Sequence, residues 1–208
     1  MIAEIEYFYS AHSAFAYIGD RRLHEIAGEA GAKIVHRPFD LRRLMSATGG
    51  AANSMTPERR AYFSRREIER WAAFRGLEIM RGIPGSHAND FTLANRVLIA
   101  AAAAGADVDG LAFAIMRAHW CDGADLADAA GLARIGEGAG IAMAPLLEAA
   151  ASDDVAAIHE ANTEAAIARP MFGSPTYIVA GDMFYGQDRL ELVARALSEP
   201  FPDTWPRD

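Results

Sequence analysis

The chain has 208 residues, of which 51% are hydrophobic and 23% charged, and its formal net charge at pH 7 is −8. This length and composition predict one globular domain, or one domain with a large insertion, and an acidic chain without a basic stripe argues against nucleic acid as a partner. Because Cys121 is the single cysteine, a disulfide framework, an iron–sulfur cluster, a cysteine-rich zinc site and a two-thiol redox relay within the chain are excluded.

The first 40 residues predict a βαβ unit. Alternation and aromatic residues favour a strand over residues 4–9, apolar side chains at helical spacing favour a helix over 14–30, and a second strand is predicted over 33–37. Gly31 ends the helix, and Pro38 ends the second strand. Two strands joined by one helix in so short a segment are expected to be parallel.

The middle of the chain predicts almost only helix. Residues 40–55 are predicted to be a loop, and Thr56-Pro57 is typical of a helix start. Helices are predicted over residues 57–75, 90–105, 108–120, 125–137, 143–151 and 153–169.

The strand pattern returns only near the end of the chain. Residues 176–180 and 183–185 predict a hairpin around the turn Gly181-Asp182, and a last helix begins at Gln187. The order βαβ, helical block, ββα is that of an α/β, thioredoxin-like fold.

This order also predicts how the chain is divided. We expect residues 1–48 and 170–208 to form the thioredoxin-like domain and residues 49–169 to form an inserted, all-helical domain. The functional site is then expected between the two.

The first candidate site lies where the first strand ends and the first helix begins, because ligands collect at such positions. Ser13 stands at the helix start, where its hydroxyl could cap the helix or point to a ligand. His12 beside it could be a base or an exposed loop histidine. Backbone N–H groups at this terminus favour an anion, including a thiolate.

Two further candidate positions flank the final hairpin. Pro175 precedes a strand; the general frequency of cis X-Pro bonds predicts a trans bond, whereas a cis bond would turn the backbone of Ser174 toward the first helix. Gln187 and Asp188 open the last helix, where the Asp188 carboxylate could stabilise the helix dipole or face a cationic amine.

Other kinds of site lack support in the sequence. The histidines show no HxxxH or HxH pairing, which argues against a metal site, and no P-loop or GxSxG motif occurs. Trp71 and Trp120 could line an aromatic pocket or belong to the core. Cys121 ends an apolar helix and is predicted to be an inert packing residue.

With these segments the chain resembles the 2-hydroxychromene-2-carboxylate isomerases, bacterial relatives of the kappa-class glutathione transferases and of the DsbA disulfide oxidoreductases. The resemblance runs from end to end. Its most specific parts are Phe172-Gly173-Ser174-Pro175-Thr176 and Gly186-Gln187-Asp188-Arg189-Leu190, and it also covers residues 7–10, 13–17, 37–41 and 69–72.

The resemblance implies glutathione as cofactor and roles for individual residues. Ser13 stands where DsbA has its first active-site cysteine, and it would hydrogen-bond the glutathione sulfur and stabilise the thiolate. Pro175 would be cis, and the backbone of Ser174 would pair with the cysteinyl part of glutathione. The other residues implied in glutathione binding are Gln187 and Asp188, at the γ-glutamyl group, and Arg59, near a carboxylate.

The sequence departs from the family pattern at two positions. Ala14 stands where the family usually has proline, and Gly50 stands where it has an asparagine that contacts glutathione. These departures bear on the substrate more than on glutathione. The residues expected in the substrate pocket are His12, Asn53, Asn89 and Trp120, and the candidates for binding a substrate carboxylate are Arg42, Arg43 and Arg81.

The reaction implied is the glutathione-dependent cis–trans isomerisation of 2-hydroxychromene-2-carboxylate to trans-o-hydroxybenzylidenepyruvate in aromatic catabolism. The alternatives are a kappa-class-like glutathione transferase that conjugates electrophiles, and a glutathione-binding relative without catalysis. A small aromatic carboxylate is the expected partner, and the resemblance suggests a homodimer.

The sequence also predicts where the protein works. Residues 1–6 lack the basic and apolar regions of a secretory signal, and no apolar window is long enough to span a membrane. We therefore expect a cytoplasmic protein without a membrane partner.

Overall fold

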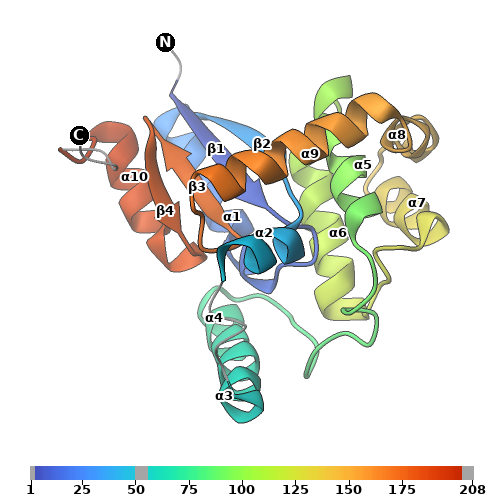
Figure 1. Cartoon of the computed structure of the whole chain (residues 1–208), viewed down its shortest axis with the longest axis horizontal. Helices are drawn as coiled ribbons and strands as arrows, with labels where there is room; N and C mark the ends of the chain where they lie inside the picture. The colour runs from blue at the N-terminus through green and yellow to red at the C-terminus, as the bar shows by residue number, and fades with distance from the viewer. Residues whose placement is uncertain (1–2, 50–55, 203–208) are drawn as a thin grey trace.

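In the computed structural model, which describes residues 3–49 and 56–202, both ends of the chain build one four-stranded sheet (Figure 1). The strands are β1 (Glu4–Tyr9), β2 (Lys33–Pro38), β3 (Thr176–Val179) and β4 (Asp182–Tyr185), in the order β2-β1-β3-β4. β1 and β2 are parallel, and β3 is antiparallel to both β1 and β4. The expected βαβ…ββα arrangement is confirmed.

Helices cover the sheet and fill the middle of the chain. In chain order they are α1 (Ala14–Ala30), α2 (Leu41–Thr48), α3 (Pro57–Tyr62), the π-helix η2 (Phe63–Glu67), α4 (Ile68–Phe74), α5 (Thr92–Ala104), α6 (Val108–Asp122), α7 (Ala129–Gly138), α8 (Met143–Ala150), α9 (Asp153–Ala168), the 3-10 helix η3 (Gln187–Arg189) and α10 (Leu190–Ser198). α1 lies on one face of the sheet and α9 crosses the other (Figure 1).

Alternation along β1 divides the core into two layers. Ile5, Tyr7 and Tyr9 pack in the larger core, which also holds the buried side chains of α1, α5, α6 and α10. Phe8 points to the opposite face and packs in a second cluster with residues of α2 and α9. A period of two therefore lets one strand bury side chains in both layers.

The predicted loop over residues 40–55 is wrong in its first half, because residues 41–48 form α2. Asp40 caps this helix by accepting a hydrogen bond from Arg43 N–H, and Gly49 ends it with a left-handed backbone (φ 69°). Leu44 is buried against Phe8 and Phe39. One buried side chain in eight residues is too weak a pattern to show a helix in the sequence, and tertiary packing supplies its stability.

Two predicted helices of the middle block have different bounds in the structure. The helix expected over 57–75 is interrupted by the π-helical turn η2, and the helix expected from residue 125 begins at 129, where the Asp128 side chain caps it. Residues 56–169 contain no strand, as expected. No helix in the described ranges is long and apolar enough to span a membrane.

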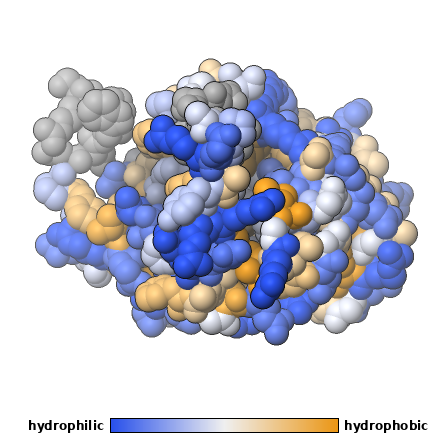
Figure 2. Space-filling model, turned by 90° about the horizontal axis from the view of Figure 1, so that it is seen from below, coloured by the Kyte–Doolittle hydropathy of each residue, from blue (hydrophilic) through white to orange (hydrophobic). Residues whose placement is uncertain are grey.

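Apolar side chains are also present on the surface. Figure 2 views the molecule from below and shows small orange, apolar patches within a mostly hydrophilic face. The large hydrophobic residues that are exposed in the described ranges are Tyr62, Phe63, Phe74, Ile83, Ile158, Phe172, Tyr185 and Leu192. Three of them recur at the cavity described next.

Candidate active site

The hydroxyl of Ser13 makes two hydrogen bonds at the start of α1. Its oxygen accepts a bond from Ala16 N–H (3.2 Å), so the capping role considered for Ser13 is confirmed. Its proton is donated to the backbone carbonyl of Ser174 (3.1 Å). The Ser13 side chain therefore caps α1 and also contacts a residue 161 positions away in the sequence. It is 7% exposed.

The Ser174-Pro175 peptide bond is cis, as the resemblance implies and against the general frequency of X-Pro bonds. The antiparallel register pairs Phe8 with Thr176 and so brings this segment beside the end of β1. There Ser10 N–H donates to Ser174 Oγ (3.0 Å). The Ser174 N–H donates a hydrogen bond to none of the described residues. A free backbone donor and the Ser174 carbonyl therefore lie together at the N-terminus of α1.

Asn95 of α5, which the sequence analysis did not single out, holds this loop in place. Its Oδ1 accepts a hydrogen bond from Ala11 N–H (2.9 Å), and its Nδ2 donates to the carbonyl of Phe39 (2.9 Å). The side chain is fully buried. The sequence does contain a signal for this role, because Asn95 is an amide within the apolar helix α5 and a buried polar side chain needs hydrogen-bond partners.

His12 is buried, so the interpretation as an exposed loop histidine is wrong. Its ring is stacked on Phe91, with 3.8 Å between centroids and 11° between planes, and its Nδ1 lies 2.8 Å from Ser10 Oγ. Burial, followed by the nearby His87 and Arg42, holds the pKa of His12 well below its usual range. His12 is therefore neutral at pH 7.

A cavity of 550 Å³ opens beside Ser13 and is lined by residues from both halves of the fold. Its polar lining includes His12, Ser13, Arg42, His87 and Ser174. Its apolar and aromatic lining includes Phe15, Ile83, Trp120, Phe172 and Tyr185. The volume is within the range of small-molecule sites, and residues from both predicted parts of the chain line the cavity.

Trp120 belongs to the core and also lines the cavity, the two alternatives considered for it. It is 2% exposed and packs in the larger core. Its Nε1 donates a hydrogen bond to the carbonyl of His12 (3.1 Å). Trp120 thereby fixes the backbone directly before Ser13.

Of the three arginines considered for a substrate carboxylate, only Arg42 lines the cavity. Its Nη2 donates to the carbonyls of His87 (3.0 Å) and Asn89 (2.9 Å), and its guanidinium lies 4.7 Å from the Phe91 ring centroid. It forms no ion pair with a carboxylate among residues 3–49 and 56–202. Arg43, by contrast, is paired with two glutamates of α9.

Gln187 and Asp188 lie outside that cavity, further along α1. Gln187 is 2% exposed and packs so closely on Gly19 that a Cβ at Gly19 would come within 2.7 Å of it. Its Oε1 accepts a hydrogen bond from Arg75 Nε (3.4 Å), a basic residue that the sequence did not single out. Asp188 is paired with Arg189. Gly19 stands six positions after Ser13, which is about 9 Å along α1.

Other residues singled out in the sequence do not line the cavity or lie outside the described ranges. Arg59 is exposed on α3 and does not line the cavity. The Asn89 side chain donates to Asp125 (2.8 Å) and does not line it either, although its carbonyl holds Arg42. Asn53 and Gly50 lie outside the described residues.

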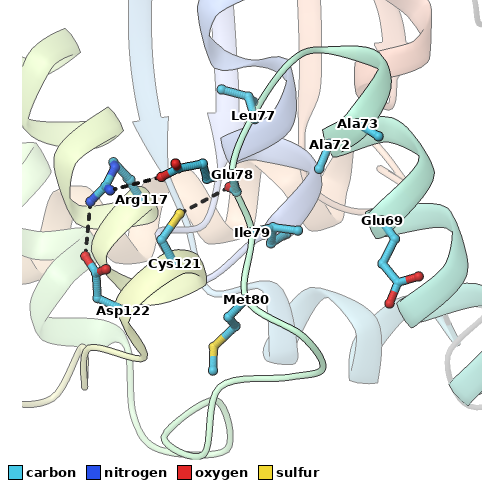
Figure 3. A pocket seen from close by; sticks show the side chains of 10 residues that line it. All are labelled: Glu69, Ala72, Ala73, Leu77, Glu78, Ile79, Met80, Arg117, Cys121 and Asp122. Carbon is cyan, nitrogen blue, oxygen red and sulfur yellow. Dashed lines mark hydrogen bonds and ion pairs between the residues drawn. The ribbon is translucent and has the colours of Figure 1, made fainter.

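Cys121 lines a different cavity, of 540 Å³, shown in Figure 3. Its Sγ donates to the carbonyl of Glu78 (3.2 Å) and lies 3.4 Å from the hydroxyl of Tyr17. Arg117 reaches Glu78 and Asp122 beside it (Figure 3). The Cys121 thiol and the Ser13 hydroxyl therefore line different cavities. Within the described ranges no cluster of three or more His, Cys, Asp or Glu side chains could hold a metal ion.

Residues 4–198 match the family described as "DSBA-like thioredoxin domain". The chain belongs to this family. It is also similar to curated proteins named 2-hydroxychromene-2-carboxylate isomerase: that of Pseudomonas putida is 25% identical over 199 residues, covering 93% of both chains. That of Pseudomonas sp. strain C18 is 27% identical, covering 95% of this chain and 91% of the relative.

Solved structures support the same fold for this DSBA-like protein. A 2-hydroxychromene-2-carboxylate isomerase superposes with a TM-score of 0.78 at 22% identity, covering 94% of both chains. The cytosolic disulfide reductase DsbM from Pseudomonas aeruginosa, solved with GSH, gives a TM-score of 0.63 at 18% identity, covering 95% and 93%. The resemblance noted in the sequence is confirmed.

Proposed function

We propose that this DSBA-like protein is a glutathione-dependent isomerase that acts on 2-hydroxychromene-2-carboxylate. The observation that carries the proposal is the hydrogen bond from Ser13 Oγ, at the N-terminus of α1, to the Ser174 carbonyl before cis-Pro175. The names of the curated relatives support the choice of substrate.

The residues around Ser13 fit the peptide-like backbone of glutathione. Ser174 presents an N–H that no described residue accepts, beside a carbonyl whose hydrogen bond comes from the movable Ser13 hydroxyl. These groups can pair with a bound cysteinyl residue as an added strand does. About 9 Å along α1, Gln187, Asp188 and Arg75 offer amide, carboxylate and guanidinium groups for the γ-glutamyl end. When bound, glutathione supplies a thiolate nucleophile to the reaction.

Ser13 favours the thiolate over the thiol form of such a ligand. Its proton now forms a neutral hydrogen bond to the Ser174 carbonyl. Rotation of the hydroxyl toward a sulfur anion would replace this bond by a charge-assisted one, which is stronger. The free N–H groups of the first turn of α1 add a positive potential at the same place.

Arg42 would bind the substrate carboxylate. Two backbone carbonyls and the Phe91 ring orient its guanidinium in the cavity, and no carboxylate of the described residues neutralises it. With Nη2 engaged by the two carbonyls, Nε and Nη1 of Arg42 keep donors for a charge-assisted hydrogen bond to a carboxylate. The aromatic side chains of Phe15, Trp120, Phe172 and Tyr185 give the same cavity an apolar lining suited to a benzene ring.

The test is the absorbance change of 2-hydroxychromene-2-carboxylate on addition of protein, with and without glutathione. We expect turnover that depends on glutathione. Conjugation of a chlorodinitrobenzene-type acceptor without isomerisation would instead support the transferase alternative. Glutathione binding by calorimetry with no rate on either compound would identify a binding protein, and absence of binding would contradict all three.

We also propose that the protein is a cytoplasmic homodimer. Tyr62, Phe63 and Phe74, which are 61%, 47% and 73% exposed, give the helices next to the cavity an apolar surface suited to a second copy. Light scattering after size-exclusion chromatography tests this, and a mass of one chain at micromolar concentration would contradict it.

A further inference from the structure

Two histidines at the cavity form a hydrogen-bonded chain that the proposed roles of Ser13 and Arg42 leave unused. His87 lies in the loop between α4 and α5, and His119 lies on α6. The Nδ1 of His87 is 3.0 Å from the Nε2 of His119, and the Nδ1 of His119 is 2.8 Å from the carbonyl of Ala124. The chain thus runs from a backbone carbonyl through two imidazoles to the cavity.

The carbonyl of Ala124 fixes the protonation of His119. A carbonyl only accepts hydrogen bonds, so the proton of the His119 ring is on Nδ1. His119 is 1% exposed, and this burial lowers its pKa against the opposing effect of the Ala124 bond, so the ring is neutral at pH 7. Its Nε2 therefore carries a lone pair.

This lone pair in turn fixes the protonation of His87. Nε2 of His119 accepts a hydrogen bond, so Nδ1 of His87 must donate it. Burial, followed by the nearby His119 and Arg42, lowers the pKa of His87 to about 4, so this ring is also neutral. The remaining nitrogen, Nε2 of His87, then carries a lone pair, and none of the described residues hydrogen-bonds to it. His87 lines the cavity.

The position of Arg42 gives this lone pair a target. Arg42 Nη2 donates to the carbonyl of His87 itself (3.0 Å), so the cation and the imidazole belong to adjacent parts of the wall. In 2-hydroxychromene-2-carboxylate the carboxylate and the hydroxyl are attached to the same carbon, C2. A carboxylate bound by Arg42 therefore brings the C2 hydroxyl to the side of the cavity formed by His87.

We propose that His87 is the acid–base residue for opening the substrate ring and that His119 is its positioning residue. This inference rests on the proposed function. Nε2 of His87 takes the proton of the C2 hydroxyl, and the electrons of that O–H bond form the C2 carbonyl. The bond from C2 to the ring oxygen breaks with its electron pair on that oxygen, which receives the same proton from His87 as a phenol. No redox change and no further reactant is needed.

His12 is less suited to this role. Its ring is 7% exposed and stacked on Phe91, and its Nδ1 is bound to Ser10. Its centroid lies 5.1 Å from that of His87, so it forms the neighbouring wall. His87 is half-buried, and its free nitrogen faces no partner of its own.

Ring opening needs no glutathione, so it can be measured separately. Exchange NMR of 2-hydroxychromene-2-carboxylate, without glutathione, follows the interconversion of the closed form and the cis open-chain form. We expect the wild-type protein to accelerate it and His87→Asn to lose about 100-fold or more of this acceleration. The Asn amide keeps a donor toward His119 but has no basic nitrogen. His24→Asn, on α1 and outside the cavity, is the matched control and should retain the wild-type rate.

The role of His119 has its own spectroscopic readout. Long-range ¹H–¹⁵N NMR should show the Nδ1–H tautomer of His87 in the wild type. His119→Asn keeps a donor for Ala124 but removes the acceptor for His87, so the tautomer should change even where the fold, checked by thermal unfolding, is intact.

The outcomes separate the two proposals. Glutathione-dependent turnover together with ring opening that is unchanged in His87→Asn would overturn the role of His87 and leave the isomerase proposal standing. Ring opening that needs His87, without any turnover on adding glutathione, would support His87 and overturn the isomerase proposal. A wild-type protein that does not accelerate ring opening at all would overturn the role of His87.

Discussion

At the cavity, the side chains of Ser13 and Arg42 both stabilise the fold and present polar groups to the cavity. The Ser13 hydroxyl caps α1 and reaches Ser174, and Arg42 spans two carbonyls while keeping its charge unpaired within the described ranges. Under the proposed function, a substitution at either residue is therefore expected to change both stability and ligand binding. Matched controls elsewhere in the chain separate the two effects.

Ser13→Ala tests the residue that carries the proposed function. We expect the thiol pKa of bound glutathione, measured by ultraviolet titration, to rise by about 1–2 pH units, because a charge-assisted hydrogen bond is lost. Loss of the cap should also cost about 1 kcal/mol of the free energy of unfolding.

Ser152→Ala is the control for this variant. Ser152 caps α9 in the same way, accepting from Val155 N–H. It should lose similar stability without affecting glutathione. Equal turnover in Ser13→Ala and Ser152→Ala would contradict the role given to Ser13.

Arg42→Gln tests the carboxylate-binding role. We expect KM for the chromene carboxylate to rise about 10-fold or more, because a hydrogen bond between two charged groups contributes roughly 1.5–3 kcal/mol. Glutathione affinity should be unchanged. Arg43→Gln removes a neighbouring exposed cation that is already paired, and its KM should stay at the wild-type value; a similar rise in both variants would sink the assignment.

At the scale of elements, one helix of the middle block holds the loop between β1 and α1 in place. Asn95 of α5 bonds to both Ala11 and Phe39, the residues that follow β1 and β2. α5 also packs against β2 and α9. The loop that presents Ser13 is therefore held by a residue about 80 positions away in the sequence.

Asn95→Leu should leave the Ala11 N–H and the Phe39 carbonyl without partners in the core. A buried unpaired polar group costs about 1–3 kcal/mol, so we expect the free energy of unfolding to fall by about 2–5 kcal/mol. Urea denaturation measures it. Asn89→Ala, at an exposed amide, should stay within about 0.5 kcal/mol of the wild type, and equal losses in the two variants would show that the Asn95 bonds do not hold the loop.

At the scale of the whole molecule, buried neutral histidines make stability depend on pH. The pKa values of His12, His87, His119 and His159 are all lowered, in each case first of all by burial. Below about pH 6.5 the unfolded chain binds protons at these residues that the folded protein does not. The contribution of these neutral histidines to the free energy of unfolding is therefore complete above about pH 6.5 and is lost as the pH falls below it.

We therefore expect the free energy of unfolding to decrease from pH 7 to pH 5, measured by urea denaturation at each pH. His24 opposes this trend: burial works against its charged form, but its hydrogen bond to Asp20 and the charge of Asp20 raise its pKa. His87→Asn removes one contributor and should show a shallower decrease. Stability that is flat or rises toward pH 5 would contradict the neutral state of these histidines.

Local sequence patterns were enough to predict the strands, their order along the chain and the segments expected at the functional site. Alternation in residues 4–9 and 176–180, the βαβ and ββα order, and the signature around Pro175 are local patterns, and local patterns can be read without coordinates. The division into residues 1–48 with 170–208, and 49–169, stays a prediction, although both parts line the cavity.

Which polar residues meet at the cavity depends on the tertiary fold, and local sequence patterns could not predict it. Of the three candidate arginines, only Arg42 lines the cavity, and His12 is buried. Residues 41–48 form α2, and His87 contacts His119 across 32 residues of sequence. Each of these outcomes depends on burial and on hydrogen-bond partners that are distant in the chain. Burial sets the pKa and partners set the tautomer, so neither property is encoded in the spacing of nearby residues.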